Sequence, residues 1–354
     1  MKVKQYIYHW LFFPLLAILL ASGTTGCSNE SVMEEGTSGK FTLSIMVRGI
    51  TTTDPGSNGS YDNYVETLRV IGYDNTGTVV CNQKYSGAEL GAVEGTDSNT
   101  YIEIIQTLED AFQGGVCDFY FVANEDDYNV HDTQSTATTL SAFLNTESLT
   151  KDELMNCVIA YTGKEPGATN TLPILMTTSV RTTLRPGDNT INNIELVRCF
   201  AKVQLKIIDQ TKSVNVVDNP VLKVTYPSYY SLWDESQDAN WISNAPEKNI
   251  ELTLEEGTIE QDNQFYLLFT SQEIYFPERL FDQDSKTEDN ALKFSFTLNG
   301  TSYKAAVADA AGTDFNIRRN THYTVIATLK KKNEVTLTVL INKWDKKTMG
   351  VEFN

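Results

Sequence analysis

The stretch ELVRCFAKVQLKI, residues 195–207, decides the fold class. From Val197 on, every second position is apolar or small, and these positions are Val197, Cys199, Ala201, Val203, Leu205 and Ile207. The positions between them are polar or charged, except Phe200. A period of two is that of a β-strand with one buried face, so this stretch predicts a long, half-buried strand.

The same period recurs on both sides of this stretch. Near the N-terminus it is carried by Phe41, Leu43, Ile45 and Val47. Residues 67–73 and 78–84 flank the turn sequence DNTG and predict a hairpin, and Asn299-Gly300 marks a second one. The looser spacing between residues 139 and 158 predicts one or two short helices. Short antiparallel strands separated by turns predict an all-β sandwich or barrel.

The sequence RPGDN at residues 185–189 predicts a domain boundary, because Pro and Gly break a polar stretch just before the long strand. We therefore expect an N-terminal domain over residues 40–188 and a C-terminal domain over residues 189–354. A chain of 354 residues with 41% hydrophobic residues is long enough for two cores.

The N-terminus has the pattern of an export signal. Lys2 and Lys4 precede an apolar run at residues 10–21, which is short for a membrane span. Small residues then lead to Cys27. The segment resembles a bacterial lipoprotein signal, which implies that residues 1–26 are removed and that Cys27 carries the lipid. An ordinary signal peptide with an incidental cysteine is the alternative. Residues 27–39 are acidic and aperiodic, and we expect a tether.

Charge and motifs argue against several classes of function. A net charge of −18 repels phosphate backbones and disfavours nucleic-acid binding. The sequence holds three His and lacks the G-x-S-x-G, P-loop and dinucleotide-binding patterns, so we expect a non-enzyme without a cofactor or metal site. Four acidic residues follow one predicted strand and could offer oxygens to calcium, although their spacing is not that of an EF-hand loop. They are Glu125, Asp126, Asp127 and Asp132.

Two further residue sets have a structural and a functional interpretation. Apart from Cys27 the cysteines allow three disulfide pairings, although Cys117 and Cys199 lie on predicted inward faces that suit buried free thiols. The four are Cys81, Cys117, Cys157 and Cys199. An aromatic group between predicted strands suits either core packing, which we favour, or stacking on sugar rings. It consists of Tyr226, Tyr229, Tyr230, Trp233 and Trp241.

Six segments, in order, resemble the fimbrillin family, the subunits of the lipoprotein-derived (type V) pili of Gram-negative gut and oral anaerobes. The segments are FYFVAN at 119–124, LPILM at 172–176, ELVRCFAKV at 195–203, IYFPE at 274–278, RRNTHY at 318–323, and Leu337-Thr338-Val339 with Trp344. The resemblance implies two transthyretin-like antiparallel β-sandwich domains with a few short helices. It also implies a structural subunit of a fimbrium at the cell surface, held to outer-membrane lipid through Cys27 with palmitate among its acyl chains.

The resemblance further implies assembly by strand exchange. In similar fimbrillins an arginine-directed protease cuts just after the first strand, so Arg48 matches the cleavage site and Gly49 the new N-terminus. The strand that would leave carries Phe41, Leu43, Ile45 and Val47. Residues 333–354 are the candidate donor, with the alternating apolar set Val335, Leu337, Val339 and Ile341. The expected partners are other fimbrial subunits, of the same or a related kind, the arginine-specific protease, and a host or bacterial receptor for adhesion.

Alternatives stay open at this point. A stalk or tip subunit would lose its first strand, whereas an uncleaved anchor subunit would keep it and stay lipidated. The rival class is a monomeric surface lipoprotein that binds glycan or a host ligand.

Overall fold

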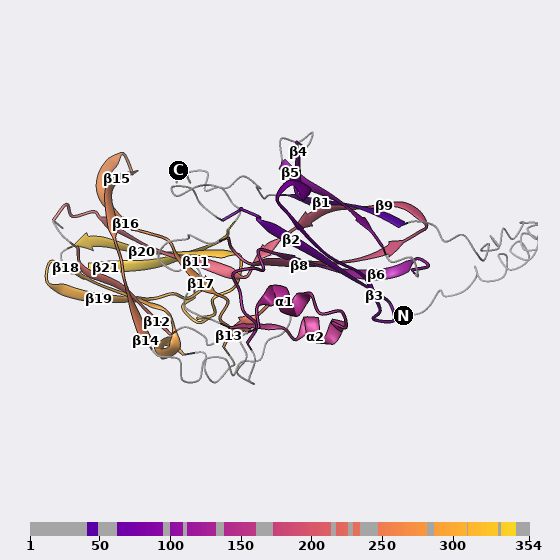
Figure 1. Cartoon of the computed structure of the whole chain (residues 1–354). Helices are drawn as coiled ribbons and strands as arrows, with labels where there is room; N and C mark the ends of the chain where they lie inside the picture. Colours follow the sequence, from indigo (N-terminus) through magenta and orange to yellow (C-terminus); the bar gives the residue numbers. More distant parts are fainter. Residues whose placement is uncertain are drawn as a thin grey trace, which may run out of the picture. The chain divides into compact units, whose positions relative to one another are not determined.

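The computed structural model describes most of the chain after residue 40. The described ranges are 41–48, 62–94, 100–108, 112–131, 138–160, 173–213, 217–225, 229–233, 247–281, 287–309, 311–331 and 334–344. Residues 39–354 form one compact unit. The fold is all-β, as predicted, and its strands build two sandwiches, each of two sheets (Figure 1). Among the described residues, none of the helices is both long and apolar enough to cross a membrane.

The N-terminal sandwich pairs a four-stranded sheet with a five-stranded one. The first has the order β4 (Gly91–Glu94), β5 (Thr100–Thr107), β1 (Phe41–Arg48) and β9 (Gly187–Glu195). The second has the order β10 (Val197–Arg198), β8 (Met176–Leu184), β6 (Gly115–Ala123), β2 (Thr67–Asp74) and β3 (Val79–Ser86). A 3-10 helix, η1 (Gly87–Glu89), connects β3 to β4.

The C-terminal sandwich is built in the same way. One sheet has the order β15 (Leu254–Gln261), β16 (Gln264–Ser271), β11 (Phe200–Asp209), β20 (Thr321–Lys331) and β21 (Glu334–Lys343), with β17 (Ile274–Pro277) also on β11. The other has the order β14 (Glu247–Glu251), β12 (Val217–Thr225), β18 (Lys293–Leu298) and β19 (Thr301–Ala306). A second 3-10 turn, η3, covers Glu288–Asn290.

Two short helices and a two-stranded ribbon complete the described fold. The helices are α1 (Leu140–Leu144) and α2 (Lys151–Met155), within the region where one or two were predicted. Each begins at a threonine whose hydroxyl accepts a backbone N–H, Thr139 for α1 and Thr150 for α2. The ribbon pairs β7 (Val158–Ala160) with β13 (Tyr229–Ser231), so a segment from the second half of the chain pairs with the first half.

The predicted long strand is β11, and its alternation places four side chains in the C-terminal core. Ala201, Val203, Leu205 and Ile207 are all fully buried there. Phe200, the exception to the alternation, packs instead in the core of the N-terminal sandwich, where its ring lies 5.5 Å from that of Tyr230. The irregularity in the pattern therefore marks the point at which the chain passes from one core to the other.

Strand pairing refines two expectations. The hairpins at DNTG and Asn299-Gly300 are confirmed, and the positive φ angles of Asn299 and Gly300, 50° and 79°, are those of a type I′ turn. The sandwiches are not wholly antiparallel, because β1 runs parallel to β9 and β11 runs parallel to β20. The domain limits 40–188 and 189–354 remain predictions. Their division falls within β9, a strand that pairs with β1 in the N-terminal sandwich.

Gly72 on β2 is a close-packed point of the N-terminal core. A Cβ at this position would lie 2.7 Å from Phe119 Cε1, 3.0 Å from Cys81 Sγ and 3.0 Å from Val80 Cγ2. Phe119 and Cys81 are buried, so their side chains have little room to move away.

We expect Gly72→Ala to lower the free energy of unfolding by about 1–3 kcal/mol, because overpacking a core forces neighbours out of their rotamers. Urea unfolding followed by tryptophan fluorescence measures the change. Gly257→Ala on β15 is the matched control, since the nearest atom to its new Cβ is Leu268 O at 4.0 Å. Equal midpoints for the two variants would contradict the packing argument.

Candidate functional site

The first strand, β1, lies inside its sheet rather than at an edge. It pairs antiparallel with β5 and parallel with β9. Ile45 is fully buried and lies opposite Ile104 on β5 and Ile191 on β9, and all three belong to the same core. Arg48 is the last residue of β1, while Cys27 and Gly49 lie outside the described residues. Loss of β1 would therefore leave backbone groups unpaired on both β5 and β9.

The last strand, β21, is an edge strand. It pairs with β20 on one side only and ends the six-stranded sheet (Figure 1). Its apolar side chains are largely exposed: Leu337 by 45%, Leu340 by 37% and Ile341 by 43%. These are three of the five large exposed hydrophobic side chains in the described part of the chain. Val335 and Val339 pack only partly against the core.

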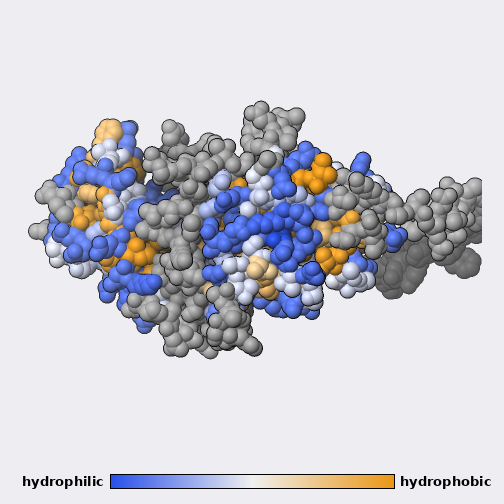
Figure 2. Space-filling model, viewed as in Figure 1, coloured by the Kyte–Doolittle hydropathy of each residue, from blue (hydrophilic) through white to orange (hydrophobic). Residues whose placement is uncertain are grey.

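A hollow lies against the middle of β21. Its volume is about 470 Å³, and its lining includes Leu337, Val339, Ala308 and Phe315. Figure 2 shows hydrophobic patches among hydrophilic residues on the visible face of both sandwiches. An edge strand with exposed apolar side chains and a hollow beside it is a surface to which another chain can add a strand.

A polar network lies where β10, β11 and the end of β21 meet the segment before β2. We call Asp62, Arg198, Lys202, Tyr275, Asn320 and Trp344 the junction cluster. Its centre is the Asp62 carboxylate, which binds the Lys202 ammonium and accepts hydrogen bonds from Tyr275 Oη at 2.7 Å and Trp344 Nε1 at 3.3 Å. Glu273 lies 2.5 Å from Lys202 Nζ, so two carboxylates flank this buried ammonium.

Arg198 closes the junction cluster from the other side. Its Nε donates to the carbonyl of Asp62 at 2.7 Å, its Nη1 to Asn320 Oδ1 at 2.7 Å, and its Nη2 to Asn63 Oδ1. The Trp344 ring lies 5.0 Å from the Arg198 guanidinium and 4.9 Å from the Lys202 ammonium, within the range of cation–π attraction. These contacts give the Arg198 guanidinium hydrogen-bond partners, although the residue is only 2% exposed.

The junction cluster explains several segments that carry the family resemblance. Arg198 and Lys202 come from ELVRCFAKV, Tyr275 from IYFPE, and Asn320 from RRNTHY, and the last member is Trp344. Asp62 was not singled out by the sequence, because an aspartate in a polar, turn-rich stretch carries no local signal of its distant partners. His322, also from RRNTHY, lies 3.8 Å from Glu273, and burial lowers its pKa.

A buried ion pair uses two more residues from these segments. Arg319 binds Glu278 at 2.8 Å, and the two side chains are 3% and 4% exposed. The same guanidinium donates to the carbonyls of Ser231 at 3.0 Å and Leu232 at 3.1 Å. It thereby fixes the segment of β13 that pairs with β7.

Asn124, the asparagine directly after β6, has a structural role at the end of that strand. Its φ of 64° turns the chain out of the strand, a conformation that asparagine tolerates. Its side chain accepts from Glu66 N and donates to Tyr64 O and Ile174 O, all at 2.8 Å. The LPILM segment is thus tied to the start of β2, although its Leu172 lies outside the described residues.

The acidic residues after β6 have different environments. Glu125 is fully buried and binds Arg69 at 2.9 Å, and Ser141 Oγ donates to it at 2.8 Å. Asp126 is half-exposed and binds Lys84 at 2.5 Å, and Asp132 lies outside the described residues. Within the described ranges, no three His, Cys, Asp or Glu residues gather as metal ligands.

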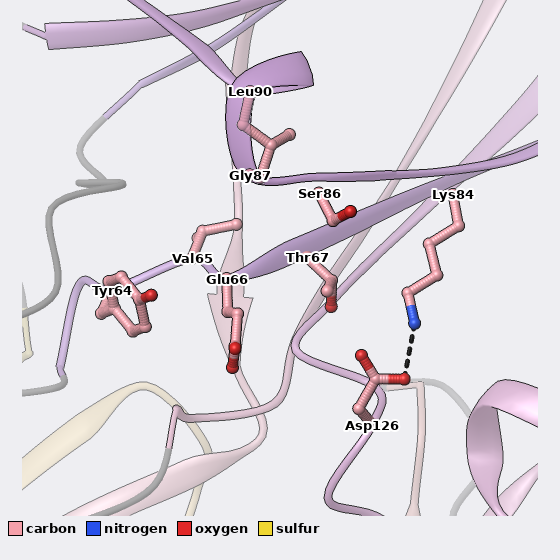
Figure 3. A pocket seen from close by; sticks show the side chains of 9 residues that line it. All are labelled: Tyr64, Val65, Glu66, Thr67, Lys84, Ser86, Gly87, Leu90 and Asp126. Atoms are coloured by element: carbon pink, nitrogen blue, oxygen red, sulfur yellow. Dashed lines mark hydrogen bonds and ion pairs between the residues drawn. The ribbon is translucent and has the colours of Figure 1, made fainter.

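The Lys84–Asp126 pair borders a pocket of about 390 Å³ at the start of β2 (Figure 3). Figure 3 shows Tyr64 and Glu66 on the opposite side from Lys84 and Asp126. Because Asp126 neutralises the lysine, the pocket presents mixed polar and apolar walls rather than one strong charge.

The aromatic group serves mainly in packing. Tyr230 is fully buried and Trp233 is 4% exposed, and Trp233 Nε1 donates to Leu154 O at 2.7 Å. Tyr229 stacks on His131 with ring centroids 4.3 Å apart. Tyr226 and Trp241 lie outside the described residues. The favoured interpretation, core packing, therefore holds for Tyr230 and Trp233.

The four cysteines that follow Cys27 are free thiols, and all are buried. The prediction of buried thiols is thus confirmed for Cys117 and Cys199. Burial raises the pKa of the Cys117 thiol to about 11 and that of Cys157 to about 12, so both remain protonated at neutral pH.

We expect Glu125→Gln to lower the free energy of unfolding by about 3 kcal/mol, because it leaves the buried Arg69 without its counter-charge. Thermal and urea unfolding measure the loss. Asp127→Asn, at an exposed position, is the control and should stay within about 0.5 kcal/mol of the parent. A calcium-dependent rise in the melting temperature of the parent that is absent from Glu125→Gln would instead assign Glu125 to a calcium site.

Comparison with known proteins places this arrangement in a family. Among solved structures, the chain is similar to the tip fimbrial protein Mfa3 from Porphyromonas gingivalis with C-terminal truncation. The identity is 16%, the TM-score is 0.54, and the match covers 86% of this chain and 100% of that one. A fimbrial assembly protein from Parabacteroides distasonis is 12% identical, with a TM-score of 0.50 and coverage of 86% and 99%. At these identities the likeness shows a shared fold.

The sequence comparison is more specific. No curated protein matches the chain. The family model described as "Major fimbrial subunit protein (FimA)" matches residues 40–216, which is half of the 354 residues and includes β1, the N-terminal sandwich and β11. The chain belongs to the major fimbrial subunit protein (FimA) family.

Proposed function

We propose that this chain is a non-enzymatic structural subunit of a cell-surface fimbrium that supports adhesion, and that it polymerises by protease-triggered strand exchange. The observation that carries the proposal is the state of β21. It is an edge strand whose apolar side chains Leu337, Leu340 and Ile341 are exposed instead of buried in its own sandwich. Such a strand gains by entering a groove that buries Leu337 and Ile341, which lie on the same face of the strand.

The groove would come from the other end of the chain. Removal of β1 exposes hydrogen-bonding groups of β5 and β9 and opens the core beside Ile104 and Ile191. An open groove of this kind is unfavourable in water, because apolar side chains that were buried become exposed and backbone groups lose their hydrogen-bond partners. A strand from a neighbouring subunit restores both by strand addition.

The two strands are similar in length and share one pattern. β1 has eight residues and β21 has ten. Phe41, Leu43, Ile45 and Val47 alternate in the first, and Val335, Leu337, Val339 and Ile341 alternate in the second. The shared period keeps one face apolar, so replacement does not change which side faces the core. Burial of four such side chains contributes on the order of 6–12 kcal/mol before ordering costs.

The trigger would be cleavage between Arg48 and Gly49 by an arginine-specific protease. Arg48 ends β1, so a cut after it separates the strand from the rest of the sandwich. The relative Mfa3 is a tip fimbrial protein, which makes a tip role as well as a stalk role worth testing here. An anchor subunit would keep β1.

Export as a lipoprotein would bring the subunit to the outer membrane. The signal at residues 1–26 and Cys27 support this step. Attachment through two or more acyl chains is stable, since each buried methylene contributes about 0.8 kcal/mol. The second candidate function, ligand binding by a monomer, draws on the pocket beside Lys84 and Asp126. Electron microscopy of cells lacking the gene, combined with a glycan-binding assay, separates the two: fewer or shorter pili support a subunit, and normal pili with lost glycan binding support the monomer.

For lipidation, we expect cells that make the parent protein to incorporate radioactive palmitate into it and cells that make Cys27→Ala not to. Ser28→Ala, the neighbouring substitution, is the control and should keep the label. Equal label in Cys27→Ala and the parent would remove Cys27 as the attachment site.

For assembly, we expect trypsin trimming of the purified protein to produce a chain that starts at Gly49 and forms ladders on an unboiled gel. Deletion of residues 333–354 should abolish the ladders, because it removes the donor strand. Arg48→Gln is the matched control: cleavage after Lys40 would still shorten it but leave β1 in place, and it should stay monomeric. Trimmed protein that remains monomeric at high concentration would sink the strand-exchange proposal.

A further inference from the structure

The C-terminal strand can leave its own sheet from one end only. β20 ends at Lys331 and β21 begins at Glu334, so the two form a hairpin that is covalently closed at that end. The other end, where Thr321 pairs with Lys343, is therefore the place at which the ladder between them can begin to open. Trp344 follows directly after that pair.

Trp344 is held much more firmly than the strand that precedes it. Its side chain belongs to a buried cluster and the residue is 9% exposed, whereas Leu337 and Ile341 are more than 40% exposed. Its amide donates to Asn320 O at 3.0 Å, and its indole Nε1 donates to Asp62 Oδ2 at 3.3 Å. The tightest contacts of the C-terminal strand are thus at the end away from the hairpin.

Asp62 is the member of the junction cluster that reaches Trp344 from the N-terminal half of the chain. Its carboxylate accepts hydrogen bonds from Trp344 and Tyr275 and forms an ion pair with Lys202. Asp62 also lies after the proposed cleavage point at Arg48, so it stays with the body of the subunit when β1 is removed. The contact can therefore act both before and after trimming.

We propose that the junction cluster is a latch that keeps the C-terminal strand on its own sheet, with Asp62 and Trp344 as its two parts. The proposal rests on the proposed strand exchange, because only a strand that must leave needs a latch. When the latch opens, the Trp344 ring moves away from the Arg198 guanidinium and the Lys202 ammonium. The hydrogen bond from Trp344 Nε1 to Asp62 also breaks. The rest of β21 then unpairs from β20 with limited further loss of buried apolar surface, since Leu337, Leu340 and Ile341 are already exposed and Val335 and Val339 are only partly buried.

The chemistry of the latch suggests two conservative variants. Asp62→Asn keeps an acceptor oxygen but removes one of the two charges that pair with Lys202 among the described residues, and Glu273 is the other. Trp344→Phe keeps an apolar ring but removes the Nε1 donor to Asp62. Neither Asp62 nor Trp344 is a member of the β20–β21 ladder, so both variants are expected to weaken the latch without removing a pair from that ladder. Asp289→Asn is the matched charge control, because the side chain of Asp289 is fully exposed.

Hydrogen exchange of the uncleaved protein, followed by mass spectrometry, tests the latch without any need for polymerisation. We expect peptides from β21 to exchange roughly fivefold to tenfold faster in Asp62→Asn and in Trp344→Phe, the effect of losing about one hydrogen bond from a local opening. Peptides from β2 and β6 should exchange as in the parent, and Asp289→Asn should match the parent throughout. Unchanged exchange of β21, or acceleration spread evenly over the whole chain in both variants, would overturn the latch.

Trimming then connects the latch to assembly. Trypsin-treated Asp62→Asn and Trp344→Phe should form ladders severalfold faster than the treated parent, because the donor strand is released more often. If the treated parent never forms ladders, the strand-exchange proposal fails, and the exchange data on the uncleaved protein still decide whether Asp62 and Trp344 hold β21. If ladders form at the same rate in all three proteins, the latch does not control release.

Discussion

The carboxylate of Asp62 links parts of the chain that are far apart in sequence. It joins the segment before β2 to β11 through Lys202, to β17 through Tyr275 and to the end of β21 through Trp344. Arg198 adds a second connection by binding the backbone of Asp62 and the side chain of Asn320. The first sandwich, the second sandwich and the C-terminal strand thus share one polar centre.

Such a centre is stable only if its charges balance. Arg198 and Lys202 supply two cations, and Asp62 and Glu273 supply two carboxylates. An unpaired charge in this position would cost several kcal/mol in lost hydration, a cost that the attraction between paired charges and their hydrogen bonds offsets. The tryptophan and tyrosine rings around the cations exclude water without adding charge.

Much of the fold could be predicted from local pattern. The alternation of β11, the turn chemistry at Asn299-Gly300 and the threonine caps of the helices are encoded within a few residues. Strands such as β8 and β9 were missed because their sequences, MTTSVRTTL and GDNTINNIE, have a polar, half-exposed face and little apolar alternation. The junction cluster could not be predicted at all, since Asp62 meets partners 140, 213 and 282 residues away.

The ribbon of β7 and β13 has a mechanical consequence. A filament under flow carries tension through every subunit, and a subunit made of two freely hinged sandwiches would extend at the hinge first. Here the segment Tyr229–Ser231 pairs with Val158–Ala160 from the other half of the sequence. The Arg319 guanidinium also donates hydrogen bonds to the carbonyls of Ser231 and Leu232. A pulling force must break this brace before the halves can part. Separation of the two halves therefore requires the loss of the β7–β13 pairing and of the Arg319 hydrogen bonds.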